Sequence, residues 1–223
     1  ALAFRQVDVL EEKLGDLDEA ARCYEQIIRE IAPGDVDGYR RLRRLHLRRG
    51  ETRRACELAE LELFLCAERD TPAERLALAL ETARLWWDRL QDAQRATVAF
   101  ERVLEFDAGH PEALAALRRL YHRIGAPERF VALAPQLFGV LEDHQERQVL
   151  LFEVAQVWEN DLDDPQQAFD WYRRAYDLYP EDGRALEELK RMAEAHAFWD
   201  ELLTVYEQAR SHELSRGGGA SQE

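Results

Sequence analysis

The chain has 223 residues, with 30 basic and 45 acidic side chains and a formal net charge of −15 at pH 7. This length allows one or two domains of about 150 residues, or one elongated array. A hydrophobic content of 46% is enough to form a core. The excess of negative charge argues against general nucleic-acid binding, because most of the surface would repel phosphates. Only 11 Gly and 7 Pro are present, which favours helices along nearly the whole chain.

Apolar residues recur at three- and four-residue intervals, and short connectors separate these periodic segments. The pattern predicts twelve helices, at residues 2–14, 17–31, 36–49, 52–68, 72–89, 92–106, 111–124, 127–141, 145–160, 165–178, 183–195 and 198–213. Pro72, Pro111 and Pro165 are expected in first helical turns, where the missing N–H is not needed. Pro135 is expected to kink or split its helix. Residues 1–213 are predicted to form one domain, and residues 214–223 a flexible Gly/Ser tail.

Three segments of the chain align around an alanine followed four positions later by an aromatic residue. They contain Ala20 and Tyr24, Ala96 and Phe100, and Ala168 and Tyr172. Weaker copies lie between them and end at Ala55, Phe130 and Leu202. The repeating unit is therefore two helical hairpins of about 36 residues each. Hairpins that cannot bury a face alone are predicted to stack into an all-α solenoid of about six hairpins.

These segments resemble the second-helix signature of tetratricopeptide (TPR) repeats. The residues that carry the resemblance are Gly15, Asp16, Asp18, Glu19, Ala20, Tyr24, Ile27 and Pro33, and again Ala168, Tyr172, Ala175 and Pro180. The resemblance covers residues 2–210, although Phe130 and Leu202 stand where the family prefers alanine. It implies a right-handed superhelix whose first helices line a concave groove. Such domains bind extended peptides or partner proteins and rarely do chemistry.

The sharpest charge feature lies in residues 36–55, where eight arginines stand against Asp37 and Glu51, a local charge of +6. Helical spacing places Arg40, Arg44 and Arg48 on one face, with Arg41 beside them. By the resemblance, this face lines the groove, and Arg119, His122 and Arg123 hold matching places two hairpins further along.

Guanidinium groups bind carboxylates and phosphates through paired hydrogen bonds. The groove is therefore predicted to bind a partner protein or an acidic peptide through seven residues, Arg40, Arg41, Arg44, Arg48, Arg119, His122 and Arg123. The alternative is that this is a solvated face, partly neutralised by Glu57, Glu60 and neighbouring acidic helices. Trp87 and Trp199 are further candidates as exposed anchors for a partner.

Catalytic and metal-binding motifs are not found. The six histidines form no HExxH pattern, and the chain has no GxSxG sequence or nucleotide-binding loop. Its three cysteines lie in apolar stripes and are expected to be buried. We therefore expect a protein-interaction scaffold that is not an enzyme and uses no cofactor or metal.

No apolar run is long enough to span a bilayer. The arginine-rich composition, with Lys13 and Lys190 as the only lysines, indicates a bacterial origin, and a cytoplasmic location is expected. The alternative function is a structural segment of a longer self-assembling solenoid or multiprotein complex, with a possible homo-oligomer formed through hairpin edges. It is motivated by the start of the chain inside a helical pattern, without Met, which suggests a fragment or a processed form.

Overall fold

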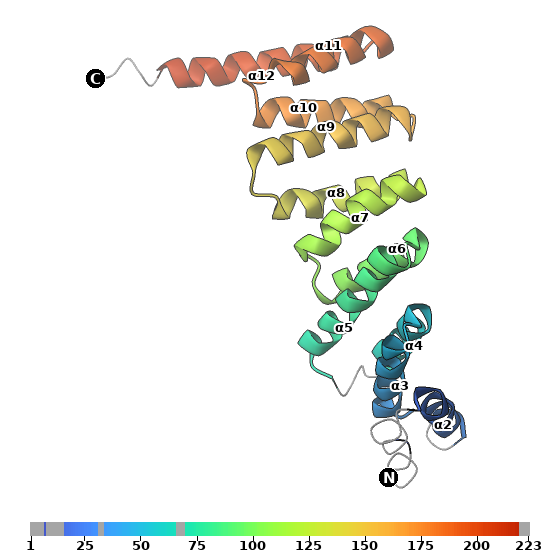
Figure 1. Ribbon diagram of the computed structural model, residues 1–223. Helices are drawn as coiled ribbons and strands as arrows, with labels where there is room; N and C mark the ends of the chain where they lie inside the picture. The colour runs from blue at the N-terminus through green and yellow to red at the C-terminus, as the bar shows by residue number, and fades with distance from the viewer. Residues whose placement is uncertain (1–6, 8–15, 31–33, 66–69, 219–223) are drawn as a thin grey trace. The chain divides into compact units, whose positions relative to one another are not determined.

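The computed structural model describes residues 7, 16–30, 34–65 and 70–218, with side chains up to residue 211. These residues form eleven α-helices and one π-helical turn and contain no strand, which confirms the predicted all-α class (Figure 1). The predicted helix at residues 2–14 lies outside the described residues except for residue 7. The helices are α2 (Leu17–Glu30), α3 (Val36–Arg48), α4 (Thr52–Leu65), α5 (Pro72–Arg84), η2 (Leu85–Arg89), α6 (Ala93–Phe106), α7 (Pro111–Ile124), α8 (Pro127–Val140), α9 (His144–Asn160), α10 (Pro165–Leu178), α11 (Gly183–His196) and α12 (Trp199–Gly218).

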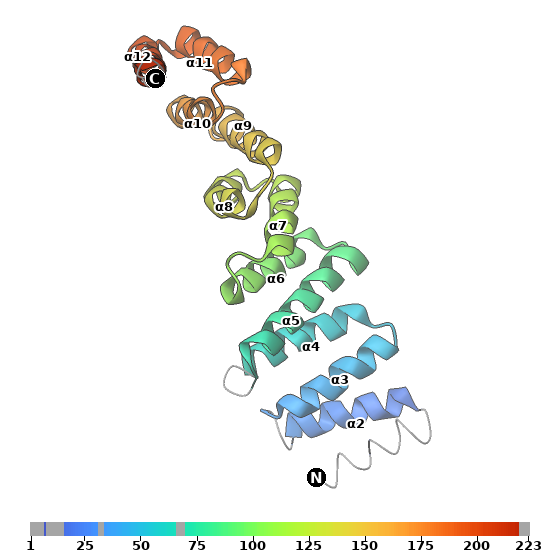
Figure 2. The ribbon, with the colours of Figure 1, turned by 90° about the vertical axis from the view of Figure 1, so that its left-hand side faces the viewer.

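The chain divides into two compact units, Ala1–Gly125 and Ala126–Glu223. In the first unit each helix from α2 to α7 packs against the next one along the chain, with η2 continuing α5. In the second unit α8 to α12 pack in the same consecutive way (Figure 2). Each unit is therefore a stack of helical hairpins, the repeat architecture that the sequence predicts.

Each described hairpin turn places one residue in the left-handed backbone region, always at the same position of the repeat. This residue lies five positions before the aligned alanine or its substitute, with φ of 77° at Gly50, 50° at Gln91, 65° at Gly125, 52° at Asp163 and 61° at Ala197. Glycine adopts this conformation without steric cost, whereas the other three residues adopt it at a cost. The repeat therefore depends on a backbone conformation that is less obvious in the sequence than its alanines.

The next residue in the strong repeats caps the second helix of the hairpin. The Asp92 side chain accepts a hydrogen bond from the Arg95 N–H at 3.1 Å, and Asp164 accepts one from Gln167 at 3.0 Å. An aspartate at this position satisfies an N–H that the helix itself leaves without a partner. The turn and the cap together begin each second helix at the same point of the repeat.

The aligned alanines and aromatic residues form the core of each unit. In the first unit Tyr24 is fully buried among residues of α2, α3 and α4, including Leu42 and Leu45. In the second unit Tyr172 and Ala168 are buried against α11 and α12. The small alanine lets neighbouring helices approach while the aromatic ring fills the space between them, as expected from the sequence.

The structure shows no split at Pro135 and corrects the predicted end of the last helix. Helix α8 runs from Pro127 to Val140 without a split at Pro135. The proline is exposed, and buried residues on both sides of it, such as Val131 and Leu137, hold the helix against the core. Helix α12 continues to Gly218, so residues 214–218 of the predicted tail are helical. The chain contains good helix formers as far as Arg216, which favours this extension. Residues 219–223 lie outside the described part.

Candidate functional site

Arg40, the first residue of the predicted arginine face, is used within the fold. Its Nε donates to Glu62 Oε1 on α4 at 2.8 Å, and its Nη2 donates to Asp70, which precedes α5. Its Nη1 also lies 3.6 Å from Asp37 on the same helix. Hydrogen bonds to Asp70 and Glu62 raise the pKa of Arg40, so this guanidinium stays charged and paired. Arg40 therefore links α3 to α4 and to the start of α5.

Glu62 is the centre of this arrangement because it lies in the interior, with only 2% of its surface exposed. Its second oxygen accepts from Arg43 Nε at 2.9 Å, and Arg43 in turn lies 3.3 Å from Glu81 on α5. A buried carboxylate is tolerated only when it is paired and hydrogen-bonded. The two arginines thus satisfy Glu62 and connect three successive helices.

Arg44 differs from its neighbours on α3. It is exposed and makes no hydrogen bond or ion pair with any residue that the structure describes. It borders a hollow of about 330 Å³ between α3 and α5. Three arginines and four carboxylates line this hollow, and two of the arginines are Arg40 and Arg43. The hollow as a whole is therefore not basic, and among the described residues that line it Arg44 is the arginine without an internal partner.

The remaining predicted residues lie on two separate helices. Arg41 and Arg48 are exposed on α3, and each takes part in an interaction within the structure. On α7, Arg119 Nε donates to the Ala115 carbonyl at 3.3 Å, while the Arg123 guanidinium lies 5.2 Å from the centre of the Trp87 ring. His122 is exposed and also interacts within the structure. None of the three α7 residues lines the hollow, so the structure does not bring the two groups together there.

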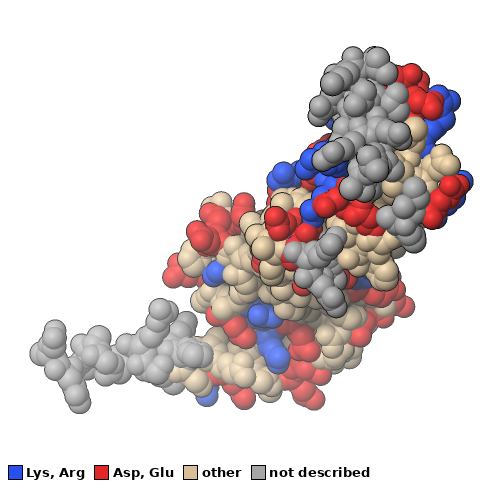
Figure 3. Space-filling view, turned by 90° about the horizontal axis from the view of Figure 1, so that it is seen from below, with Lys and Arg blue, Asp and Glu red and all other residues tan. Residues whose placement is uncertain are grey.

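Charge on the surface is mixed. The face in Figure 3 shows acidic and basic side chains next to each other. Among the described residues no group of three or more His, Cys, Asp or Glu side chains could hold a metal ion. Within the same residues, none of the helices has the length and apolar character to cross a membrane.

Neither a protein-family model nor a curated protein matches the sequence. Among solved structures, the chain is similar to the nearly identical TPR-like repeats of a Podosopora anserina putative kinesin light chain, with 21% identity and a TM-score of 0.41 over 86% of this chain and 99% of that chain. It is also similar to MamA, with 15% identity and a TM-score of 0.39 over 82% and 93% of the two chains. The third is YrrB, described as a TPR protein with an unusual peptide-binding site, with 13% identity and a TM-score of 0.39 over 84% and 90%.

The sequence pattern finds the arginine face but does not reveal how its charges are used. Apart from Asp37, the acidic partners of Arg40 and Arg43 lie 19 to 38 residues away along the chain. Helical spacing identifies neighbours only within about four residues. The available signal is the buried position of Glu62, which falls among the apolar residues of α4 in the periodic pattern.

Proposed function

We propose that the chain is a protein-interaction scaffold, and not an enzyme, that binds a partner protein or an acidic peptide along the face formed by the first helices of the hairpins in the first unit, α3, α5 and α7. One observation carries this proposal. Arg44 is an exposed arginine beside a hollow, with no internal partner among the described residues. Arg41, Arg48, Arg119, His122 and Arg123 stay predicted members of the same face. The role of Arg40 in binding is limited by its two carboxylate partners in the fold.

Photo-crosslinking from inside the hollow tests the proposal. Ala77 is exposed on α5 and lines the hollow, so it is replaced by a benzoylphenylalanine residue in the full chain. We expect a discrete crosslinked partner from the source lysate, and its loss when Arg44→Glu is added. Val98 on α6, 59% exposed, gives a control position on a second helix. Equal adducts from both positions, or an adduct that survives Arg44→Glu, would contradict this site.

A structural role is the second candidate, and an apolar stripe on α12 favours it. Leu203 and Tyr206 are 56% and 41% exposed. In the repeat register they correspond to Phe169 and Tyr172 of α10, each of which is 1% exposed because α11 and α12 cover it. An equivalent hairpin from a second copy would cover the α12 stripe in the same way. Sedimentation of the wild-type chain and of Leu203→Glu tests this role. The role requires that the mass of the wild type rises with concentration and that the mass of the variant does not.

A bacterial origin and a cytoplasmic location rest on composition alone and stay predictions.

A further inference from the structure

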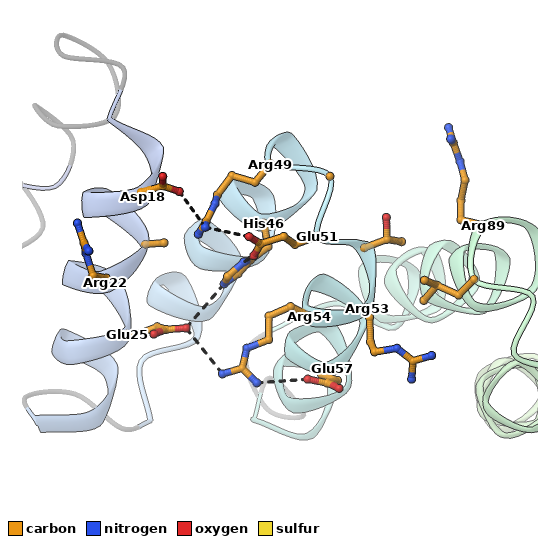
Figure 4. A pocket seen from close by; sticks show the side chains of 14 residues that line it. Asp18, Arg22, Glu25, His46, Arg49, Glu51, Arg53, Arg54, Glu57 and Arg89 are labelled. Atoms are coloured by element: carbon orange, nitrogen blue, oxygen red, sulfur yellow. Dashed lines mark hydrogen bonds and ion pairs between the residues drawn. The ribbon is translucent and has the colours of Figure 1, made fainter.

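A second hollow lies at the turn ends of the hairpins in the first unit, away from the arginine face. It is an open cleft of about 990 Å³ bordered by α2, the α3–α4 turn and the end of η2 (Figure 4). Five arginines and four carboxylates line it, so its charge is positive in a chain of net charge −15. The ion pairs within the cleft show which of these charges are available to a ligand.

Two of the five arginines form ion pairs with all four carboxylates of the cleft. Arg49 Nη2 lies 2.8 Å from both Asp18 and Glu51. Arg54 lies 3.7 Å and 3.2 Å from the cleft's two other carboxylates, on α2 and α4. Figure 4 draws these ion pairs as dashed lines, and the two that reach carboxylates on α2 join this helix to the following hairpin. They leave three arginines of the cleft without a cleft carboxylate.

The three other arginines are Arg22, Arg53 and Arg89, and their partners are weak or lie outside the cleft. Arg22 pairs with Glu19 one turn earlier on α2. Arg53 is 57% exposed and lies 3.6 Å from Asp92, whose side chain already caps α6. Arg89 is exposed and has no hydrogen bond or ion pair with the described part of the chain. The cleft therefore holds cationic groups that are available to an anionic ligand.

One lining residue of the cleft, His46, has a buried nitrogen, Nε2, without a hydrogen-bond partner among the described residues. Nδ1 of this ring lies 2.6 Å from Glu51 Oε2, which assigns the ring proton to Nδ1 in the neutral form and leaves Nε2 as an acceptor. The closest carboxylate oxygen to Nε2 belongs to Glu25, at 3.9 Å, and it has no proton to donate. Glu25 is 35% exposed, and its two ion-pair distances, 3.9 Å to His46 and 3.7 Å to Arg54, are long.

We propose that this cleft binds an extended acidic segment of a partner protein. Carboxylates of the segment pair with Arg53 and Arg89, and a backbone N–H of the segment donates to His46 Nε2. A peptide supplies both groups, whereas an inorganic anion supplies acceptors only. This site rests on the proposed role of the chain as an interaction scaffold, but it uses none of the residues of the arginine face.

The test measures fluorescence anisotropy of a labelled ten-residue glutamate peptide with the full chain at about 50 mM salt, where ionic contacts are little screened. The cleft variant carries Arg53→Glu and Arg89→Glu. The control variant carries Arg29→Glu and Arg210→Glu, two exposed arginines that line neither hollow, and it changes the net charge equally. We expect the cleft variant to bind at least about tenfold more weakly than the wild type, since each lost arginine contact is charge-assisted. The control should stay within about threefold of the wild type.

Each other outcome overturns the site. Loss in a separate Arg44→Glu variant, with binding kept in the cleft variant, would move the peptide to the arginine face and leave the proposed function standing. Equal losses in both variants would mean that net charge alone attracts the peptide, and equal binding of a ten-residue glutamine peptide would remove the role of charge. Absence of binding to the wild type would exclude the cleft as a site for acidic segments. A mass that rises with concentration and falls in the cleft variant would assign the cleft to a second copy.

Folding of the variants is checked by circular dichroism. Arg53 lies 5.4 Å from the buried Trp86 ring, so its substitution carries some risk to stability. Arg89→Glu alone keeps the test decisive, because Arg89 is exposed and makes no hydrogen bond or ion pair with the described residues. Its expected effect is a loss of about threefold or more.

Discussion

The buried ion-pair network at Glu62 gives the sharpest prediction about stability. Glu62→Gln keeps the shape of the side chain but removes its charge and turns one acceptor oxygen into an NH₂ group. That group faces a guanidinium that also only donates, so one of the hydrogen bonds from Arg40 and Arg43, at 2.8 and 2.9 Å, is lost. Arg43 is the more affected partner because its side chain is only 12% exposed.

Removing one member of a buried ion pair costs about 3–5 kcal/mol. Arg40 is 30% exposed and keeps Asp70, so the lower end of this range, about 3 kcal/mol, applies. The first unit, Ala1–Gly125, has an unfolding entropy of about 0.26 kcal/mol/K at typical values per residue. The substitution should therefore lower the Tm of this unit by about 11 °C.

Thermal unfolding of the full chain, followed by circular dichroism and fitted with one transition for each unit, measures this shift. Glu112→Gln is the matched control, because Glu112 pairs with Arg84 at the surface, with side chains 40% and 50% exposed. Exposed pairs contribute about 0–1 kcal/mol, so the control should lose no more than about 4 °C. Equal shifts for Glu62→Gln and Glu112→Gln would refute the importance of the buried network.

Three further predictions follow from the turns and the buried titratable groups. Gln91→Gly should be neutral or should stabilise the fold by up to about 1 kcal/mol, because Gln91 has a φ of 50°. Gln94→Gly, in the exposed first turn of α6, should instead cost up to about 1 kcal/mol. Urea unfolding compares the two variants, and equal losses of stability would contradict the strain at the turn. Burial raises the pKa of Cys56 to about 12, so iodoacetamide at about pH 8 should modify this thiol only after unfolding. Modification of Cys56 in the native chain, detected by peptide mass spectrometry, would contradict its burial. Burial also raises the pKa of Tyr172 to about 12, from about 10 in an unfolded chain, so its stabilisation is complete below about pH 10 and is lost as the pH rises towards 12. Tyr172→Phe should therefore flatten the fall in Tm above about pH 10, while the same change at Tyr206, 41% exposed, should leave that fall unaltered.

Much of the architecture follows from the sequence, because local patterns determine it. The spacing of apolar residues places most described helices within a few residues, and the repeated alanines and aromatics identify buried positions such as Tyr24 and Tyr172. The turns are partly hidden, since Gln91, Asp163 and Ala197 take the place of a glycine in the left-handed conformation. Only the alignment of these three positions with Gly50 and Gly125 would suggest the left-handed conformation.

The candidate sites are less accessible from the sequence, because they depend on contacts between helices. The spacing on α3 does not distinguish Arg40, which is held by distant carboxylates, from Arg44, which is not. Arg49 and Arg53 belong to the basic segment that the sequence identifies. Arg89 completes the cleft from a different hairpin, and no local pattern predicts that it lies there.

Selection from a random peptide library displayed on phage, with the full chain as bait, tests the proposed binding function most directly. We expect sequences enriched in Asp and Glu that bind the wild type and the Arg210→Glu control alike. Binding of sequences that contact the arginine face should be lost with Arg44→Glu, and binding at the cleft should be lost with Arg89→Glu. A library that yields no acidic sequences, or sequences whose binding is unaffected by both substitutions, would contradict recognition of a partner through these unpaired arginines.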